Sequence, residues 1–164
     1  SSTILSSFDS PSSSVKGLAF DGVNLISCDS NSDLIYIHSG VTATVSSSFA
    51  APSGNCSSLT IANGNLISAD ASTNLIYIHD GITSTVLSSF ATAGASTRGL
   101  TFDGRNLISS SDSTNRIYVH DGVSATILTR FAAPSTSPAG LAFTGTNLVS
   151  VNKFNDTIYV HGRA

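Results

Sequence analysis

The stretch GLAFDGVNLISCDSNSDLIYIH, residues 17–38, decides the fold, because the chain contains it in four related forms. Its segment NLIS begins at Asn24, Asn65 and Asn106, and it recurs as NLVS at Asn147. Each of these positions lies 41 residues after the one before it, and four such steps equal the 164 residues of the chain. Two further series keep the same step, a Phe at Phe8, Phe49, Phe90 and Phe131 and a Tyr-x-His segment at Tyr36, Tyr77, Tyr118 and Tyr159. A sustained period of this length is the signature of a repeat architecture.

Each 41-residue unit contains four short segments that favour β-strands. In the first unit these are residues 17–20, 25–29, 34–38 and 44–49, separated by turn residues such as Asp21-Gly22 and Ser39-Gly40. Four antiparallel strands in about 40 residues form one blade of a β-propeller. The sequence therefore predicts an all-β fold, a single β-propeller domain of four 4-stranded blades over residues 1–164. The expected blades are residues 12–52, 53–93, 94–134 and 135–164.

The chain begins with a segment that belongs at the end of a unit. Residues 1–11, SSTILSSFDSP, match the outermost strand of the later units, with Phe8 at the position of Phe49. We therefore expect residues 1–11 to form the closing outer strand of the fourth blade, either in the same chain or in a partner chain, which would leave no free sheet edge. The residues expected to make this closure or assembly contact are Thr3, Ile4, Leu5 and Phe8.

The composition excludes several classes of function. The net charge is −3 with only seven Lys and Arg, so the chain lacks the basic surface that nucleic acids and anionic membranes require. No apolar run approaches the ~20 residues of a membrane span. Charged residues make up 10% of the chain, and Ser and Thr supply most of its polarity. From this composition we expect an extracellular or cell-surface location.

The repeat resembles the NHL-type propeller repeat and its lactonase-like and streptogramin-lyase-like relatives. The similarity is clearest in residues 17–38 and in PAGLAFTGTNLVSVN, residues 138–152. This resemblance implies a propeller, but its known members include interaction scaffolds, RNA-binding modules and metal-dependent enzymes, so it does not select a function. The metal-dependent relatives use acidic ligands that include Glu, and this chain has no Glu. Single-chain relatives generally have five to eight blades.

Four histidines recur at the repeat step, at His38, His79, His120 and His161. Each would end the third strand of its blade, two strand spacings of about 4.8 Å from the innermost strand. Four such side chains would lie too far apart to share the ~2 Å bonds of one metal site. The sequence therefore predicts a structural role for these histidines, with no metal and no cofactor.

The loops between the second and third strands are rich in Asp and Asn. Two interpretations remain open, because carboxylate and amide oxygens can hold a hard cation or ligand and also satisfy tight turns. The turn interpretation is favoured, since no loop matches a complete calcium motif. The candidate binding residues are Asp29, Asn31, Asp33, Asp70, Asn74, Asp112, Asn115, Asn152, Asn155 and Asp156.

The two cysteines, Cys28 and Cys56, lie at the end of one predicted strand and just before the first strand of the next blade. Propeller topology places both at the same face in neighbouring blades, so a disulfide and a pair of free thiols are both compatible with the sequence. The other units carry Ala69, Ser110 and Val151 at the position of Cys28, so the fold does not require Cys there.

Three functions compete at this stage. The first is a non-enzymatic interaction or structural scaffold for a protein or glycan partner, because the framework repeats strictly while loops such as DSNSD and NKFND differ. The second is self-assembly into rings or filaments, in which residues 1–8 complete a blade of another copy. The third, a lactonase- or lyase-like enzyme, is disfavoured because no Ser has an oriented His and Asp partner in the sequence pattern.

Overall fold

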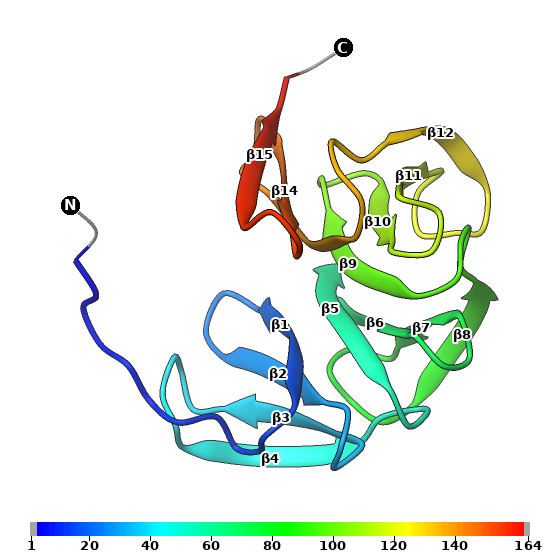
Figure 1. Ribbon diagram of the computed structural model, residues 1–164. Helices are drawn as coiled ribbons and strands as arrows, with labels where there is room; N and C mark the ends of the chain where they lie inside the picture. The colour runs from blue at the N-terminus through cyan, green and yellow to red at the C-terminus, as the bar shows by residue number, and fades with distance from the viewer. Residues whose placement is uncertain (1–2, 163–164) are drawn as a thin grey trace.

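The computed structural model describes residues 3–162, which form fifteen β-strands and no helix. No helix capable of crossing a membrane is therefore found among these residues. The strands make four antiparallel sheets placed around a common centre like the blades of a propeller (Figure 1). The predicted all-β propeller of four blades is confirmed.

Each of the first three blades is a four-stranded meander, and the fourth has three strands. Blade 1 contains β1 (Val15–Phe20), β2 (Leu25–Asp29), β3 (Leu34–His38) and β4 (Val45–Ala50). Blade 2 contains β5 (Cys56–Ala62), β6 (Asn65–Asp70), β7 (Leu75–His79) and β8 (Val86–Ala91). Blade 3 contains β9 (Thr97–Phe102), β10 (Leu107–Ser111), β11 (Arg116–His120) and β12 (Ile127–Ala132). Blade 4 contains β13 (Pro138–Phe143), β14 (Leu148–Asn152) and β15 (Thr157–His161).

The turns take the conformations that their residues favour. Asn63 and Gly64, between β5 and β6, both have positive φ, of 53° and 81°, as a two-residue hairpin turn of the primed type requires. The loop between the second and third strands of every blade also contains one left-handed residue. These four residues are Asp33, Asn74, Asn115 and Asp156, with φ between 51° and 56°.

Each blade presents two faces, which we name by the neighbour they meet. The forward face points to the next blade along the chain and carries, in blade 1, Ile26, Cys28 and Ile35. The rear face points to the preceding blade and carries, in blade 2, Leu59 and Leu66. These residues pack together, and equivalent clusters join blade 2 to blade 3 and blade 3 to blade 4. The core is therefore three copies of one blade-to-blade interface.

Glycine allows the inner strands of neighbouring blades to approach closely. A Cβ added at Gly17 would lie 2.8 Å from the Cα of Ser58, and one added at Gly99 would lie 2.9 Å from the backbone nitrogen of Leu141. At Gly140, the same position in blade 4, an added Cβ would meet only a Val151 methyl group, at 3.1 Å. The forward face of blade 4 therefore has no backbone against it.

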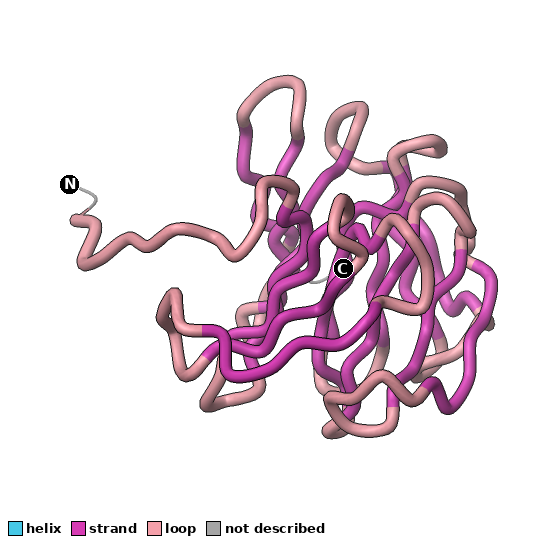
Figure 2. The backbone as a smooth tube through the Cα atoms, turned by 90° about the horizontal axis from the view of Figure 1, so that it is seen from below, coloured by secondary structure: helices cyan, strands magenta, loops and turns pink. Residues whose placement is uncertain are grey.

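The predicted closing strand is not formed in this chain. The β13–β15 sheet has no fourth strand, and Thr3, Ile4 and Leu5 lie outside any strand. Figures 1 and 2 show this N-terminal segment leaving blade 1 as an extended arm on the side where the ring is open. Pairing fails because blade 4 is not packed against blade 1, so β15 is out of reach of the arm. Residues 1 and 2 of the predicted strand lie outside the described residues.

We expect Gly99→Ala to lower the stability of the fold, because the added methyl group meets backbone atoms of blade 4 that cannot move independently. The free energy of unfolding should fall by about 1–3 kcal/mol, as for other overpacked sites. Urea denaturation measures this change. Gly140→Ala is the control at the same repeat position, and an equal loss of stability in both variants would contradict the interpretation.

Candidate functional site

A Ser–His pair occupies the same place in every blade, buried in blades 1 to 3 and partly buried in blade 4. The Oγ atom of Ser68 lies 2.9 Å from Nε2 of His79, and Nδ1 of His79 lies 2.8 Å from the carbonyl oxygen of Thr83. Because a carbonyl oxygen only accepts, Nδ1 carries the proton and Nε2 accepts the hydroxyl hydrogen of Ser68. The same pairing joins three further pairs, Ser27 with His38, Ser109 with His120 and Ser150 with His161.

Each of these histidines also contacts the Phe that precedes it by 30 residues. The ring centroids of Phe49 and His79 are 6.0 Å apart, and those of Phe90 and His120 are 5.7 Å apart. In these pairs the Phe belongs to the outer strand of one blade and the His to the rear face of the next. The pairs therefore join neighbouring blades at their outer edge.

The Ser–His pairs of blades 2 and 3 are closed off from solvent. Burial lowers the pKa of His79 and His120 below the ordinary value of 6.5, although the Thr83 and Ser124 carbonyls oppose this shift. Ser68 and His79 are almost completely buried, as are Ser109 and His120, so no substrate reaches a hydroxyl group there. Among residues 3–162 no group of three or more His, Cys or Asp side chains is arranged to hold a metal ion.

The candidate loop residue Asp29 is engaged by its own turn. Its carboxylate accepts hydrogen bonds from the backbone nitrogens of Ser14, Asn31 and Ser32 at 2.7–2.8 Å. Burial raises the pKa of Asp29, but the Ser32 and Asn31 hydrogen bonds outweigh it and hold the pKa at about 2. The candidate residue Asn31 contributes its backbone nitrogen to this turn.

Asp70 and Asn152 occupy the same repeat position as Asp29 and make similar turns. Asp70 accepts from the backbone nitrogens of Asn55, Ser72 and Thr73. Burial raises the pKa of Asp70, and the hydrogen bonds from Thr73 and Asn55 lower it overall. Asn152 accepts from the backbone nitrogens of Phe154 and Asn155, and the Asn155 amide in turn donates to the hydroxyl of Tyr159.

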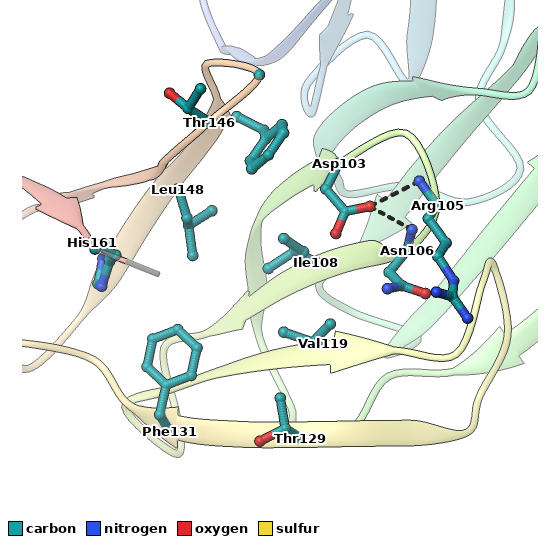
Figure 3. Close-up of a pocket in the computed structure, with 13 residues that line it drawn as sticks. Asp103, Arg105, Asn106, Ile108, Val119, Thr129, Phe131, Thr146, Leu148 and His161 are labelled. Atoms are coloured by element: carbon teal, nitrogen blue, oxygen red, sulfur yellow. Dashed lines mark hydrogen bonds between the residues drawn. The ribbon is translucent and has the colours of Figure 1, made fainter. Parts of the chain in front are cut away.

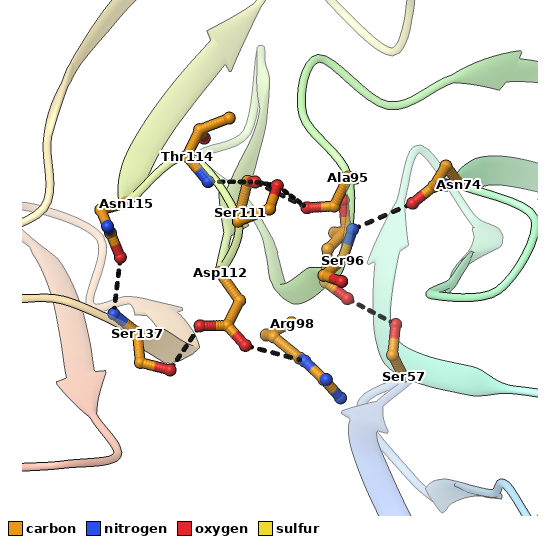
Figure 4. Close-up of polar contacts among 12 residues, drawn as sticks. Ser57, Asn74, Ala95, Ser96, Arg98, Ser111, Asp112, Thr114, Asn115 and Ser137 are labelled. Atoms are coloured by element: carbon orange, nitrogen blue, oxygen red, sulfur yellow. Dashed lines mark hydrogen bonds and ion pairs between the residues drawn. The ribbon is translucent and has the colours of Figure 1, made fainter.

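In blade 3 the position of Asp29 is taken by Ser111, and the candidate residue Asp112 follows it (Figure 4). Asp112 accepts a hydrogen bond from the Ser137 hydroxyl and lies 3.7 Å from Nε of Arg98. Both partners of this ion pair are partly exposed to water, so it contributes little to stability. Asp112 therefore ties blade 3 to the strand entry of blade 4.

The remaining candidate residues are the left-handed ones of the same loops. The side-chain oxygen of Asn74 accepts from the backbone nitrogen of Ser96, and that of Asn115 accepts from Ser137 (Figure 4). Asp33 and Asp156 have the same positive φ. The ten candidates lie at the same end of their blades. In five of them a side-chain oxygen accepts a backbone N–H, namely in Asp29, Asp70, Asn74, Asn115 and Asn152. Binding of a cation or ligand by them stays a prediction.

Cys28 and Cys56 are adjacent free thiols in the interface between blades 1 and 2. A hydrogen bond with Cys28 and burial raise the pKa of the Cys56 thiol, and the neighbouring Asp70 carboxylate raises it further. Protonated, buried thiols react slowly. The predicted proximity is therefore found, and a disulfide between them stays a prediction.

A pocket of about 870 Å³ lies between blades 3 and 4 (Figure 3). Its walls include Ile108, Phe131 and His161. In the two other interfaces an apolar residue fills the same space, Ile82 between blades 1 and 2 and Val123 between blades 2 and 3. The residue at this repeat position in blade 4 is number 164, which lies outside the described residues. The pocket is thus bounded by both blades, with the polar side chains of Asp103, Arg105 and Asn106 in its wall.

Two blade faces have no neighbouring blade among the described residues, and both expose apolar side chains. On the rear face of blade 1, Leu18 is 59% exposed, although the equivalent Leu59 in blade 2 is 2% exposed. On the forward face of blade 4, Ile158 is 69% exposed, although the equivalent Ile117 in blade 3 is fully buried. Other exposed apolar residues of these faces are Phe20, Val41, Val151 and Val160. We call these surfaces the open faces of blades 1 and 4.

Sequence reasoning predicted the histidines but missed their serine partners. The signal was present, because each Ser of the NLIS or NLVS segment precedes a His by 11 residues in all four units. The open faces gave no such signal, since their residues are the same as those buried elsewhere.

No protein-family model and no curated protein matches this chain. Its fold is found in solved structures of low sequence identity. The computationally designed Ika4 protein is 17% identical, with a TM-score of 0.67, and the match covers 100% of both chains. The glutaminyl cyclase of Myxococcus xanthus is 15% identical over 89% of this chain and 71% of its own, with a TM-score of 0.72. The WD40 repeats of RRP9 are 16% identical over 91% of this chain and 51% of theirs, with a TM-score of 0.66. These similarities show the propeller fold alone.

We expect stability to fall as the pH is lowered from 7.5 to 5. His79, His120 and His161 have a lowered pKa in the fold because of burial, so the unfolded chain binds protons first as the pH passes 6.5. No other side-chain type in the chain ordinarily titrates in this window. Thermal unfolding followed by circular dichroism measures the effect, and an unchanged midpoint between pH 7.5 and 5 would contradict it.

A second loss should follow below pH 3.8, as Asp29 approaches its pKa of about 2. Asp29→Asn is the matched variant, because Asn152 already stands at this position in blade 4. The variant should lose part of this acid-dependent step and keep the step near pH 6.

We expect both thiols to be unreactive in the folded protein at pH 8 and fully reactive after unfolding in urea. Their burial and the raised pKa of Cys56 protect them. Titration with a coloured thiol reagent, with and without urea, measures this. Absence of titratable thiols in unfolded, unreduced protein would show instead that Cys28 and Cys56 are bridged.

Proposed function

We propose that this protein is a non-enzymatic interaction scaffold that binds protein through the open faces of blades 1 and 4. The carrying observation is that Leu18 and Ile158 are exposed at positions that are buried in the other blades. Exposed apolar surface of this extent, at positions built for packing, is typical of a protein–protein contact. The low charge and high Ser and Thr content favour an extracellular or cell-surface location for this contact.

The polar groups of the described chain support a role without catalysis. The buried hydroxyls of the Ser–His pairs are enclosed, and the Asp29 and Asp70 carboxylates are held by backbone nitrogens. A lactonase- or lyase-like activity would need these oxygens to leave their turns and bind an ion. The framework hydrogen bonds therefore favour a scaffold over an enzyme.

The partner class that fits the open faces best is protein. A glycan is bound mainly by polar groups and by aromatic rings, whereas the exposed apolar residues of these faces are aliphatic except for Phe20. Each open face is also one half of an interface that the chain forms three times, so the complementary surface is another β-sheet face.

We expect the purified chain to associate in solution, because each copy carries both halves of the missing interface. Sedimentation velocity over a concentration series should show a species heavier than the 16.8 kDa of one chain. Leu18→Ser, in the open face of blade 1, should weaken this association. Leu128→Ser is the control, because Leu128 is similarly exposed at 54% but lies on the outermost strand β12.

A chain that sediments as one copy at every concentration would contradict association through the open faces. Equal weakening by Leu18→Ser and Leu128→Ser would contradict the assignment to these faces. A calcium titration by calorimetry that releases heat in the wild type, and none in Asp29→Asn, would favour the ligand-binding alternative instead.

A further inference from the structure

The two open faces of this chain are complementary to each other. In the three formed interfaces, the forward face of one blade packs on the rear face of the next, as Ile117 of blade 3 does near Leu148 of blade 4. In the missing fourth interface, the forward-face residues would be Val151 and Ile158 and the rear-face residue Leu18, all now exposed. The chemistry and shape of the fourth interface are therefore those of the other three.

A strand and a sheet edge are also left unpaired at the same place. In blades 1 to 3 the third strand pairs with an outer strand, for example Ile35 with Phe49 and Ile117 with Phe131. In blade 4 the strand β15 has no such partner. The N-terminal arm, residues 3–11, carries Phe8 at the repeat position of Phe49. By the same register, Phe8 belongs opposite Ile158.

The arm is already held where an outer strand of a preceding blade would lie. The centroids of Phe8 and His38 are 6.3 Å apart, and the three Phe–His pairs at formed interfaces have centroid distances of 5.6–6.0 Å. His38 is consequently buried on the rear face of blade 1, although the inner strand of that face is exposed. Blade 1 thus carries the outer strand of a blade whose other strands are missing.

The packing of the formed interfaces opposes closure of four blades on themselves. A four-blade ring needs a turn of about 90° per blade, twice that of an eight-blade ring. Between blades 1 and 2 and between blades 3 and 4 the inner strands cannot move closer, because Gly17 and Gly99 leave no room for a Cβ. Between blades 2 and 3 Ser58 stands at this position, and its Oγ accepts a hydrogen bond from the backbone nitrogen of Leu100. A sharper wedge would instead separate the outer strands and break the Phe–His contacts.

We infer that two copies of this chain close one ring, in which the N-terminal arm of each copy completes blade 4 of the other. This inference rests on the proposed function and specifies its partner as a second copy. The open face of blade 1 packs on the open face of blade 4 in the other copy. The ring contains two such contacts, which are identical because a two-fold axis through the centre of the ring relates the copies. Every blade then has four strands, and no sheet edge is left unpaired between the copies.

The decisive experiment is a cysteine cross-link between the arm and β15. By the same register Ser7 belongs opposite Tyr159, as Ser48 lies opposite Tyr36, and this pair leaves Phe8 and Ile158 in place. Ser7→Cys and Tyr159→Cys are therefore placed in one chain, in a background where Cys28→Ala and Cys56→Thr copy Ala69 and Thr97 of the following units. Residues directly opposite on antiparallel strands have Cβ atoms about 4.5–5.5 Å apart, which permits a disulfide after mild oxidation. A non-reducing denaturing gel then shows which chain the arm has joined.

The expected result is a covalent two-chain product from the double variant, and a native mass by light scattering of twice 16.8 kDa. A cross-link within a single chain would overturn the inference, because it would show that the ring closes on itself. A heavier native assembly would overturn the two-copy ring and leave the proposed function standing. Association without any cross-link would also overturn the two-copy ring and leave the proposed function standing. A single-chain mass without a cross-link would overturn both the two-copy ring and the proposed function.

Two substitutions test the interface without depending on oxidation. Gly140→Ala adds a Cβ that has only a Val151 methyl group nearby in one chain, but that would meet backbone atoms of β1 in the second copy. It should weaken dimerisation tenfold or more and leave the unfolding of the dissociated chain nearly unchanged. Ile158→Ser should act in the same direction through lost apolar burial, and Leu128→Ser should not. Dimerisation unaffected by both Gly140→Ala and Ile158→Ser would overturn the inference.

Discussion

The contact between neighbouring blades is the constraint on which the rest of this structure depends. It is fixed at two radii: near the axis by backbone packing at Gly17 and Gly99, and at the periphery by contacts such as Phe90 with His120. Apolar side chains fill the space between these two radii. The angle between neighbouring blades cannot change without the loss of either the inner backbone contacts or the outer Phe–His contacts. This angle, and with it the number of blades in a closed ring, is therefore a property of the repeat.

The polar residues of the repeat serve the same constraint. The Ser–His pairs of blades 2 and 3 place a neutral imidazole at the periphery, so that it can contact a Phe ring on the outer strand of the preceding blade without a buried charge. The loop carboxylates and amides hold the turns that start each blade, as Asp29 does for Ser14 and Asp70 for Asn55. The engagement of Asp29 and Asp70 by the framework supports the association proposed above over ion chemistry at these two carboxylates.

The sequence was sufficient to predict the strands but not the closure. The 41-residue step located every blade, and the predicted strand at residues 34–38 coincides with β3 (Leu34–His38). Closure depends on the angle between neighbouring blades. This angle results from the packing of side chains such as Ile35 and Leu59 across the interface, which the sequence pattern of a single repeat does not reveal. The loop residues show a different limit: Asp29 was located correctly, but the oxygens that cap a turn and those that bind a cation are the same atoms.

The four described blades do not close a ring, and their two open faces are the two halves of one interface, on strands paired as in the other blades. Leu18 and Ile158 are therefore ready to pack, because they sit on strands already held by their own blades. Only the arm must become ordered when the contact forms, and Phe8 already fixes one end of it against His38. Little conformational entropy is then lost on association, since most of the interface is preorganised. The unpaired edge of β15 would promote irregular aggregation if it stayed uncovered. A strand that pairs with this edge in a defined register therefore also protects the chain against aggregation.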